Sequence, residues 1–161
     1  FCTLDEVMYH AFKFFENKVS KKYKYCCMMY ATNPMVDRHF IKFGLEKLIK
    51  TEAYTAISVS TMPYALQRSL RIDNKGHLAP FWLKHQKSRS QDLEELYQDA
   101  AQFNWIDIAQ FLDCYGKQND IYPKAIPIKV PRIGAQDIDT QEDWELAELL
   151  HKATKGKQKI D

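Results

Sequence analysis

Apolar and polar positions follow a helical spacing at the start of the chain. Thr3 and Glu6 have the spacing of a capping box, the reciprocal pair of hydrogen bonds that begins many helices. The apolar residues of this segment recur every three or four positions: Leu4, Val7, Met8, Ala11, Phe12 and Phe15. We therefore predict an amphipathic helix that ends at the lysine-rich segment 18–22.

Two apolar runs then predict strands, with a second helix between them. The run YKYCCMMYA at 23–31 is nearly continuous, which is typical of a strand buried on both faces of a parallel sheet. Asn33 and Pro34 end this run, and Asp37 begins a second amphipathic helix. The run TAISVST at 55–61 is rich in β-branched residues and is predicted as another buried strand. Helix, strand, helix and strand in this order indicate an α/β domain.

The pattern changes in the second half of the chain. Residues 70–83 hold a turn sequence, DNKG, between two short extended runs, and they are predicted to form a hairpin. Further extended runs follow at 103–108 (FNWIDI) and at 125–131 (AIPIKVP). Because of Pro127, the second of these is predicted as an edge strand or an extended connection.

A final helix is predicted after Asp139. Thr140 and Asp143 have the spacing of a second capping box. The face of this helix that should point inward carries its apolar residues: Trp144, Leu146, Ala147 and Leu150. Residues 152–161 are expected to be a polar tail.

Composition narrows the class of protein. A chain of 161 residues with 45% hydrophobic and 27% charged residues fits one globular domain. The formal net charge of +2 gives no reason to expect a nucleic-acid partner, and no apolar run is long enough to span a membrane. The four cysteines show no metal-ligand spacing: Cys2, Cys26, Cys27 and Cys114. Cys26 and Cys27 lie inside an apolar run, where a reduced cysteine acts as a small hydrophobic residue, which favours a reducing, cytoplasmic location. Because the chain begins with Phe1, we expect a cut chain or a fragment.

Asp137 and Asp139 are the first candidate for chemistry. In an extended segment, residues two apart point to the same face, so their carboxylates would repel each other unless a hard cation lies between them. Mg²⁺ takes one or two protein carboxylates and completes its shell with water and phosphate oxygens. The alternative is that Asp139 only helps to start the final helix and Asp137 is solvated.

Polar side chains are dense between residues 63 and 102. They offer forked cationic donors and neutral amides, which suit carboxylates, phosphates and sugar hydroxyls: Gln67, Arg68, Arg71, Arg89, Gln91, Asp92, Gln98, Asp99 and Gln102. The alternative is a polar hairpin surface with structural ion pairs, for instance Arg89 with Asp92. The five glycines are scattered, so no glycine-rich phosphate loop is present in the chain.

Four motifs occur in the order found in one enzyme family. They are YATNP at 30–34, PYALQR at 63–68, RSQDLEELYQDAAQF at 89–103 and DIDTQEDWELAE at 137–148. In these motifs the chain resembles the CMP-sugar synthetases, the cytidylyltransferases that activate nonulosonates such as sialic acid. The tyrosine of YATNP, with PYALQR and the DAAQF stretch, is more similar to the pseudaminic acid branch than to the sialic acid branch. The resemblance covers nearly the whole chain.

The resemblance implies a Rossmann-like nucleotide-diphospho-sugar transferase fold, α/β, that is incomplete at its amino terminus. Residues 1–161 would form a single domain, in which residues 63–102 are a protruding hairpin insertion that exchanges contacts with a second subunit. The expected assembly is therefore a homodimer, and the partner subunit would help to complete the sugar site.

The resemblance also assigns roles to individual residues. Asp137 and Asp139 would hold Mg²⁺ on the triphosphate, and Tyr30 and Thr32 would approach the nucleotide. The remaining residues would bind the acidic sugar: Gln67, Arg68, Arg89 and Gln102. The implied reaction is attack of the anomeric hydroxyl of a nonulosonic acid on the α-phosphate of CTP, with release of pyrophosphate, which requires alignment and a cation more than covalent help.

Departures from the family pattern limit these expectations. The family begins with a strand and a phosphate-binding loop rich in Arg, Gly, Ser and Lys, which this chain lacks, so we expect impaired or absent activity. The family often has His at Gln98, Gly at Ala101 and an aromatic residue at Asn104. Two alternatives remain: a synthetase for sialic or legionaminic acid, and a catalytically silent fragment that serves dimerisation or sugar binding.

Overall fold

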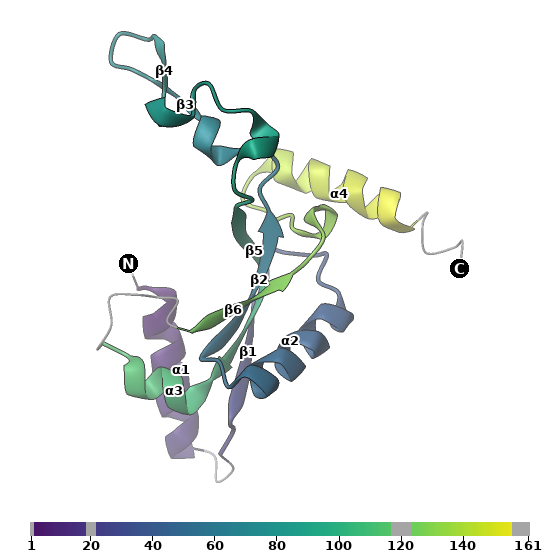
Figure 1. The fold of residues 1–161 in the computed structure, drawn as a ribbon. Helices are drawn as coiled ribbons and strands as arrows, with labels where there is room; N and C mark the ends of the chain where they lie inside the picture. Colours follow the sequence, from purple (N-terminus) through teal and green to yellow (C-terminus); the bar gives the residue numbers. More distant parts are fainter. Residues whose placement is uncertain (1, 19–21, 117–123, 156–161) are drawn as a thin grey trace.

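A four-stranded sheet forms the centre of the molecule (Figure 1). The computed structural model describes residues 2–18, 22–116 and 124–155. In these ranges the sheet has the order β1 (Tyr25–Met29), β5 (Tyr97–Asp107), β2 (Thr55–Thr61) and β6 (Ala125–Lys129). β5 is antiparallel to both of its neighbours, whereas β6 runs parallel to β2. Three strands therefore run in one direction, with β5 reversed between two of them.

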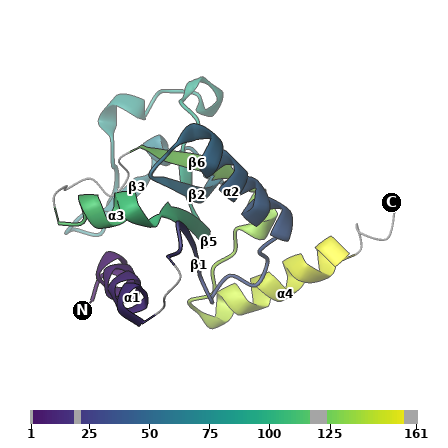
Figure 2. The ribbon, with the colours of Figure 1, turned by 90° about the horizontal axis from the view of Figure 1, so that it is seen from below.

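Helices cover both faces of this sheet (Figures 1 and 2). α2 (Arg38–Thr51) packs on one face over a core that includes Leu48 and Phe103, which are 1% and 0% exposed. α1 (Leu4–Lys18) and α3 (Ile108–Cys114) share the other face, where Phe12, Ile106 and Phe111 form a second core cluster. The predicted α/β architecture is confirmed, and no helix of the described ranges is long and apolar enough to cross a membrane.

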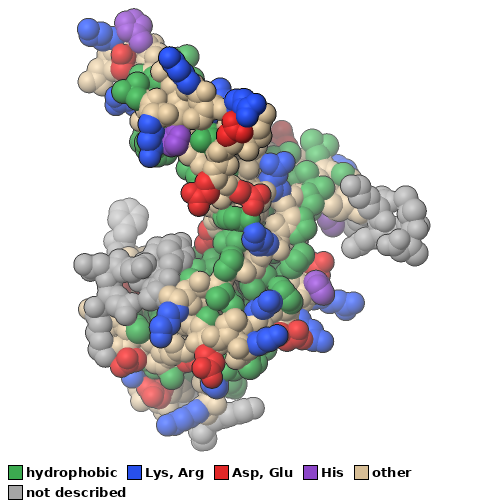
Figure 3. Space-filling model, in the orientation of Figure 1, with side chains coloured by type: hydrophobic (Ala, Val, Ile, Leu, Met, Phe, Trp, Pro, Cys, Tyr) green, Lys and Arg blue, Asp and Glu red, His purple; other side chains and the backbone are tan. Residues whose placement is uncertain are grey.

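Residues 63–96 form a projecting segment, which Figure 3 shows joined to the body by a narrow neck. β3 (Leu70–Ile72) and β4 (Leu78–Pro80) pair as a separate two-stranded sheet, and they confirm the predicted hairpin. The short helices η1 (Leu66–Arg68), η2 (Leu83–His85) and η3 (Ser90–Asp92) complete the segment. Its base is closed by the backbone hydrogen bond from Met62 N to Leu96 O, at 3.0 Å. Residues 97–102 of the range predicted as an insertion lie in β5 of the main sheet.

The prediction for 23–31 is wrong in two respects. β1 pairs antiparallel with β5 and lies at the edge of the described sheet. None of its residues is fully buried, and Met29 is 52% exposed. A continuous apolar run does not distinguish a central strand from an edge strand, because the neighbouring strands are set by distant parts of the chain.

β5 is longer than the sequence predicts. It begins at Tyr97 rather than at Phe103, and Ile108 starts α3 instead of ending the strand. The polar residues at 97–102 hide the first part of the strand from a hydrophobicity pattern. The predicted edge strand at 125–131 is confirmed as β6.

Both capping boxes are confirmed, although the inward face of the last helix is only partly correct. Thr140 Oγ1 accepts a hydrogen bond from Asp143 N at 3.2 Å, and Asp143 Oδ2 accepts one from Thr140 N at 2.9 Å. The Thr3 and Glu6 pair does the same at the start of α1. In α4 (Gln141–Lys155), Ala147 is buried.

Two other residues of that predicted face, Trp144 and Leu146, are instead 53% and 44% exposed. Figure 1 shows the reason, since α4 lies beyond the end of the sheet and not against either face. Residues 152–155 of the predicted tail continue α4, and residues 156–161 lie outside the described residues.

Candidate functional site

A large bulge interrupts β5 where it passes β2. Ile57 pairs with Asn104, whereas Val59 pairs with Asp99, so four residues of β5 lie opposite the single residue Ser58. Within this bulge, defined as residues 99–103, Ala101 has a φ of 48°. That is the left-handed region, which costs a residue with a Cβ about 1 kcal/mol. Bulges are common next to active sites, where they redirect side chains.

Side-chain acceptors hold the bulge in place. The hydroxyl oxygen of Ser58, which is fully buried, accepts hydrogen bonds from Gln102 N at 3.3 Å and from Phe103 N at 3.1 Å. Asp99 Oδ1 accepts one from Ala101 N at 2.8 Å. The backbone N–H groups of Ala101, Gln102 and Phe103 thereby have acceptors, as buried N–H groups require.

Two loops meet at this bulge. Asn33, in the loop after β1, is buried and donates from Nδ2 to Ala100 O at 2.9 Å, and Tyr30 N donates to Gln102 O at 3.1 Å. From the other side, the loop after β6 comes close, because Gln102 Nε2 donates to Gly134 O at 2.6 Å.

The two loops also contact each other. Ile138 N donates to Thr32 O at 3.1 Å. Both loops follow the carboxyl ends of strands that run in the same direction, β1 and β6. This is the end of an open α/β sheet at which ligands bind.

The structure therefore gathers five of the predicted site residues around the bulge. Tyr30 and Thr32 lie in the first loop, Gln102 in the bulge, and Asp137 and Asp139 in the second loop. Asp137 is half-buried and Asp139 is exposed. The side chain of Gln102 is 2% exposed. Its hydrogen bond to Gly134 gives it a structural role, because it joins the bulge to the second loop.

Asp99 is a site residue to which sequence reasoning gave no role of its own. Although Asp99 is exposed to solvent, partial desolvation of its carboxyl group raises its pKa above the ordinary value of 3.8. The hydrogen bond from Ala101 N opposes this, and the negative charge of Asp137 raises the pKa further. Asp99 and Asp137 are therefore electrostatic neighbours, although 38 positions separate them in sequence (137 − 99). The one available signal was its place in the motif RSQDLEELYQDAAQF, because the polar residues at 97–102 do not have the pattern of a strand.

The donor set of the site fits a hard divalent cation. The negative charge of Asp137 disfavours the charged form of Asp99, and a cation between two carboxylates relieves such repulsion. Among the described residues there is no group of three or more His, Cys, Asp or Glu side chains that could enclose a metal. Mg²⁺ does not need one, because it keeps water and phosphate oxygens in its shell. The assignment of Asp137 and Asp139 as its ligands stays a prediction.

The other predicted sugar-binding residues lie on the projecting segment, and their side-chain hydrogen bonds end within it. Gln67 Nε2 donates to Glu94 O at 2.9 Å, and Arg68 Nη1 donates to Ser90 Oγ at 3.0 Å. Arg89 forms the structural ion pair that composition offered as an alternative, because its Nε and Nη2 donate to Asp92 Oδ2 and Oδ1 at 2.7 and 3.1 Å. None of these hydrogen bonds connects Gln67, Arg68 or Arg89 to the bulge of the same chain.

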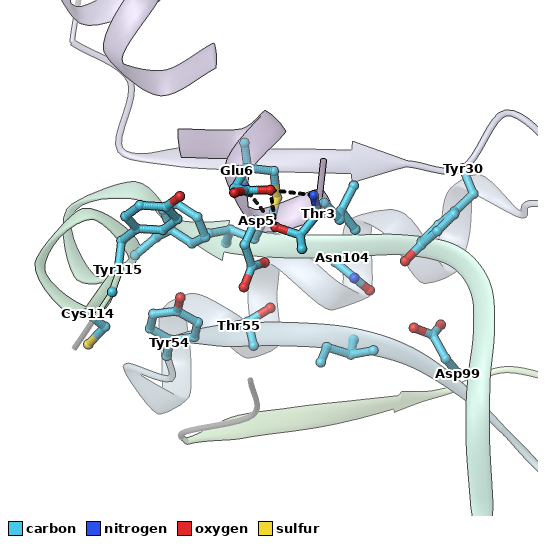
Figure 4. Close-up of a pocket in the computed structure, with 16 residues that line it drawn as sticks. Thr3, Asp5, Glu6, Tyr30, Tyr54, Thr55, Asp99, Asn104, Cys114 and Tyr115 are labelled. Atoms are coloured by element: carbon cyan, nitrogen blue, oxygen red, sulfur yellow. Dashed lines mark hydrogen bonds between the residues drawn. The ribbon is translucent and has the colours of Figure 1, made fainter. Parts of the chain in front are cut away.

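A cavity of about 610 Å³ opens on the sheet face covered by α1 and α3 (Figure 4). Tyr30, Asn104 and Asp99 line one end of it, next to the bulge. The labelled residues of Figure 4 line the cavity from α1, the sheet and α3: Thr3, Asp5, Glu6, Tyr30, Tyr54, Thr55, Asp99, Asn104, Cys114 and Tyr115. Polar groups over an apolar strand surface are typical of small-molecule sites.

The fold is shared with a solved enzyme structure. The structure of 4-diphosphocytidyl-2C-methyl-D-erythritol synthase from Anaerococcus prevotii DSM 20548 superposes with a TM-score of 0.58, over 92% of this chain and 67% of that chain, at 12% sequence identity. The predicted Rossmann-like α/β fold is thus confirmed.

Sequence comparison specifies the relationship further. Two curated relatives, both pseudaminic acid cytidylyltransferases of Campylobacter jejuni subsp. jejuni, are 31% identical to the chain over 131 residues. One comes from serotype O:23/36 (strain 81-176) and the other from serotype O:2 (strain ATCC 700819 / NCTC 11168). The match covers 81% of this chain and 55% of each relative, so the chain spans about half the length of the curated relatives it matches. No protein-family model matches the chain. The chain is therefore similar to two pseudaminic acid cytidylyltransferases over most of its length, as its motifs predict.

Proposed function

We propose that this chain provides three parts of a cytidylyltransferase that couples CTP to a nonulosonic acid of the pseudaminic acid type. They are the bulge, the projecting segment and the loop after β6 that carries Asp137 and Asp139, here called the acidic loop. The observation that carries the proposal is the 31% identity with two pseudaminic acid cytidylyltransferases across 81% of the chain. The geometry supports it, because the loop after β1 and the loop after β6 meet at the carboxyl ends of these two strands.

The reaction is nucleotidyl transfer, in which the anomeric hydroxyl attacks the α-phosphate and pyrophosphate leaves. The chain's own part is to align the two substrates beside Tyr30, Thr32 and the bulge. Asp137 and Asp139, with Asp99 as neighbour, would hold Mg²⁺, which offsets negative charge on the phosphates when bound.

The direct test is product formation. The chain is supplied with CTP, Mg²⁺ and a panel of nonulosonic acids, and pyrophosphate release and the CMP-sugar are measured. We expect turnover with pseudaminic acid in preference to sialic and legionaminic acids. Turnover only with another acid would assign the chain to that sugar instead.

Substitution of the acidic loop tests the metal assignment. In a preparation that forms the CMP-sugar, Asp137→Asn and Asp139→Asn should each lower turnover by about 100-fold or more, because a cation contributes several kcal/mol to such transfers. Glu142→Gln, on the exposed first turn of α4, is the matched control and should keep full turnover. Unchanged turnover in Asp139→Asn would remove that residue from the metal site.

The projecting segment supports a homodimer in which the sugar site is completed by a second copy of this chain. Its apolar side chains are strongly exposed, for instance Ile72 at 73% and Leu83 at 76%. Exposed apolar surface on an extended arm is typical of a protein interface. Gln67, Arg68 and Arg89 would then reach the bulge of the partner copy. The Arg89 and Asp92 side chains are 72% and 50% exposed, and an ion pair this exposed contributes little stability, so a sugar carboxylate can replace Asp92.

Kinetics test this role of Arg89. Arg89→Ala should raise KM for the sugar at least about tenfold while KM for CTP stays the same, because a charged hydrogen bond contributes about 1.5–3 kcal/mol. A change confined to CTP would move Arg89 to the nucleotide side.

A second candidate function is a module that binds sugar or mediates dimerisation without catalysis. It is favoured by the separation of Gln67, Arg68 and Arg89 from the bulge, since their side-chain hydrogen bonds end within the projecting segment. Sugar binding in the absence of nucleotide binding and product would identify it. For either function we place the protein in the cytoplasm, since its cysteines are free thiols.

A further inference from the structure

Lys129, the last residue of β6, lies on the sheet face that carries the cavity. Val59 pairs with Asp99 on one side and with Lys129 on the other, and laterally paired residues point to the same face of a sheet. Ile57, two residues before Val59, lines the cavity, so Val59, Asp99 and Lys129 share that face. Two strand spacings, about 10 Å, separate the backbones of Lys129 and Asp99.

Tyr97 fixes the direction of the Lys129 side chain. The ammonium group lies 4.3 Å from the centroid of the Tyr97 ring and also donates a hydrogen bond to the hydroxyl oxygen of Tyr97. The same hydroxyl donates to the carboxylate of Glu95. Because Tyr97 lies on β5, the lysine crosses β2 and ends on the strand that forms the bulge.

The ammonium group retains donors for a ligand. A lysine has three N–H donors, and among the described residues Lys129 has one hydrogen-bond acceptor, the Tyr97 hydroxyl. A lysine is charged at neutral pH, and the hydrogen bond to Tyr97 is the main cause that raises the pKa of Lys129 further, with a contribution from the negative charge of Glu95. A cation is thus held in one orientation at an end of the sheet that otherwise presents the carboxylates of Asp99 and Asp137.

We propose that Lys129 binds an oxyanion of the substrates, with Tyr97 as its positioning residue, on the same sheet face as Asp99. This inference rests on the proposed function, in which both substrates are anions. Two sources share the chemistry, the carboxylate of the sugar and a phosphate of the nucleotide. Because Tyr97 holds the ammonium group beside β5, the strand of Asp99, its charge offsets part of the repulsion that an anionic substrate meets from the carboxylates there.

Direct binding to the 161-residue chain tests this without requiring turnover. Affinities for pseudaminic acid and for CTP are measured by calorimetry at low and at high salt, for the native chain and for Lys129→Met. Lys129→Met should weaken one of the two ligands about tenfold and reduce the salt dependence of that ligand, because a charged contact is screened. A loss of affinity for the sugar identifies its carboxylate as the anion that Lys129 binds, and a loss of affinity for CTP identifies a phosphate.

Three further variants separate a binding role from a structural one. Lys129→Arg keeps the charge and should restore most of the affinity. Tyr97→Phe keeps the ring but removes the hydroxyl, and it should weaken the same ligand as Lys129→Met by a smaller factor. Lys47→Met is the matched control, because Lys47 lies 5.4 Å from the ring of Phe43 on α2 and should leave both affinities unchanged.

Several results would overturn the inference. The first is that Lys129→Met binds both ligands as tightly as the native chain does. The second is that the native chain binds neither ligand. The third is that Lys129→Arg does not restore the affinity that Lys129→Met loses. The proposed function is judged separately by product formation. A chain that binds through Lys129 without forming a CMP-sugar contradicts only the catalytic proposal, and full turnover with an indifferent Lys129 contradicts only this one.

Discussion

The bulge at the end of the main sheet and the projecting segment satisfy their polar groups in opposite ways. At the bulge, polar side chains are buried and bond to parts of the chain far away in sequence, as Asn33 does with Ala100. On the projecting segment, polar side chains are exposed and bond to near neighbours, as Arg89 does with Asp92, while apolar side chains such as Ile72 face solvent. One chain can therefore fix the bulge by itself, whereas the projecting segment leaves apolar side chains in solvent that the proposed dimer would bury.

The largest expected effect concerns that second surface. Ile72→Ser combined with Leu83→Ser should raise the dissociation constant of the dimer by about 100-fold or more, because a few central apolar residues dominate most interfaces. The free energy of unfolding of the monomer should hardly change, since both side chains are largely exposed. Sedimentation velocity over a range of concentrations measures the dissociation constant.

Leu149→Ser provides the control for this pair. Leu149 is 64% exposed, but it lies on α4 and not on the projecting segment. The same dissociation constant in the double variant and in Leu149→Ser would place the interface elsewhere.

The next effect tests the internal fixation of the bulge. Ser58→Ala should lower the free energy of unfolding by about 2 kcal/mol, because it leaves the buried N–H groups of Gln102 and Phe103 without their acceptor. Equilibrium unfolding in urea measures the change. Ser60→Ala is closely matched, since Ser60 is on the same strand and 1% exposed, but its hydroxyl has no hydrogen-bond partner among the described residues. Its loss should cost little, and equal losses in the two variants would argue against the role of Ser58.

A smaller effect is expected at the strained residue of the bulge. Ala101→Gly should raise the free energy of unfolding by about 1 kcal/mol, because glycine adopts a φ of 48° without the clash of a Cβ. Ala100→Gly should lower it by a similar amount, since Ala100 is buried and is not among the residues with positive φ. Thermal unfolding of both variants under one condition decides the sign, and a loss of stability in Ala101→Gly would contradict the strain.

The smallest effect is a pH dependence at Asp99. Its pKa is raised in the folded state, so the folded protein binds the proton more tightly and loses stability as pH rises from the ordinary value of 3.8 to the folded value. Asp99→Asn removes this loss, and its Oδ1 still accepts from Ala101 N. The difference in unfolding free energy between the variant and the native chain should therefore grow in favour of the variant across that window and be constant below it. A flat difference throughout would show that Asp99 is not perturbed.

Local sequence predicted the local features of the fold correctly. Both capping boxes, the hairpin at 70–83, the strand at 55–61 and the edge strand with Pro127 are all present. Each depends on residues a few positions apart, whose geometry is set by backbone sterics and short-range hydrogen bonds. The motifs also placed Tyr30, Thr32, Asp137 and Asp139 in two loops that do lie together.

The sequence by itself thus determined most of the elements, their order and the resemblance to the cytidylyltransferases, but it missed α3 and the first half of β5. Only the tertiary structure decided that β1 lies at an edge, that α4 lies beyond the sheet, and that Asp99 approaches Asp137 and lies across Val59 from Lys129. These features depend on strand pairing between residues tens of positions apart, and on a bulge that shifts the register of β5. Hydrophobic periodicity carries no information about which distant strand becomes the neighbour, because that choice is made by packing of the whole sheet.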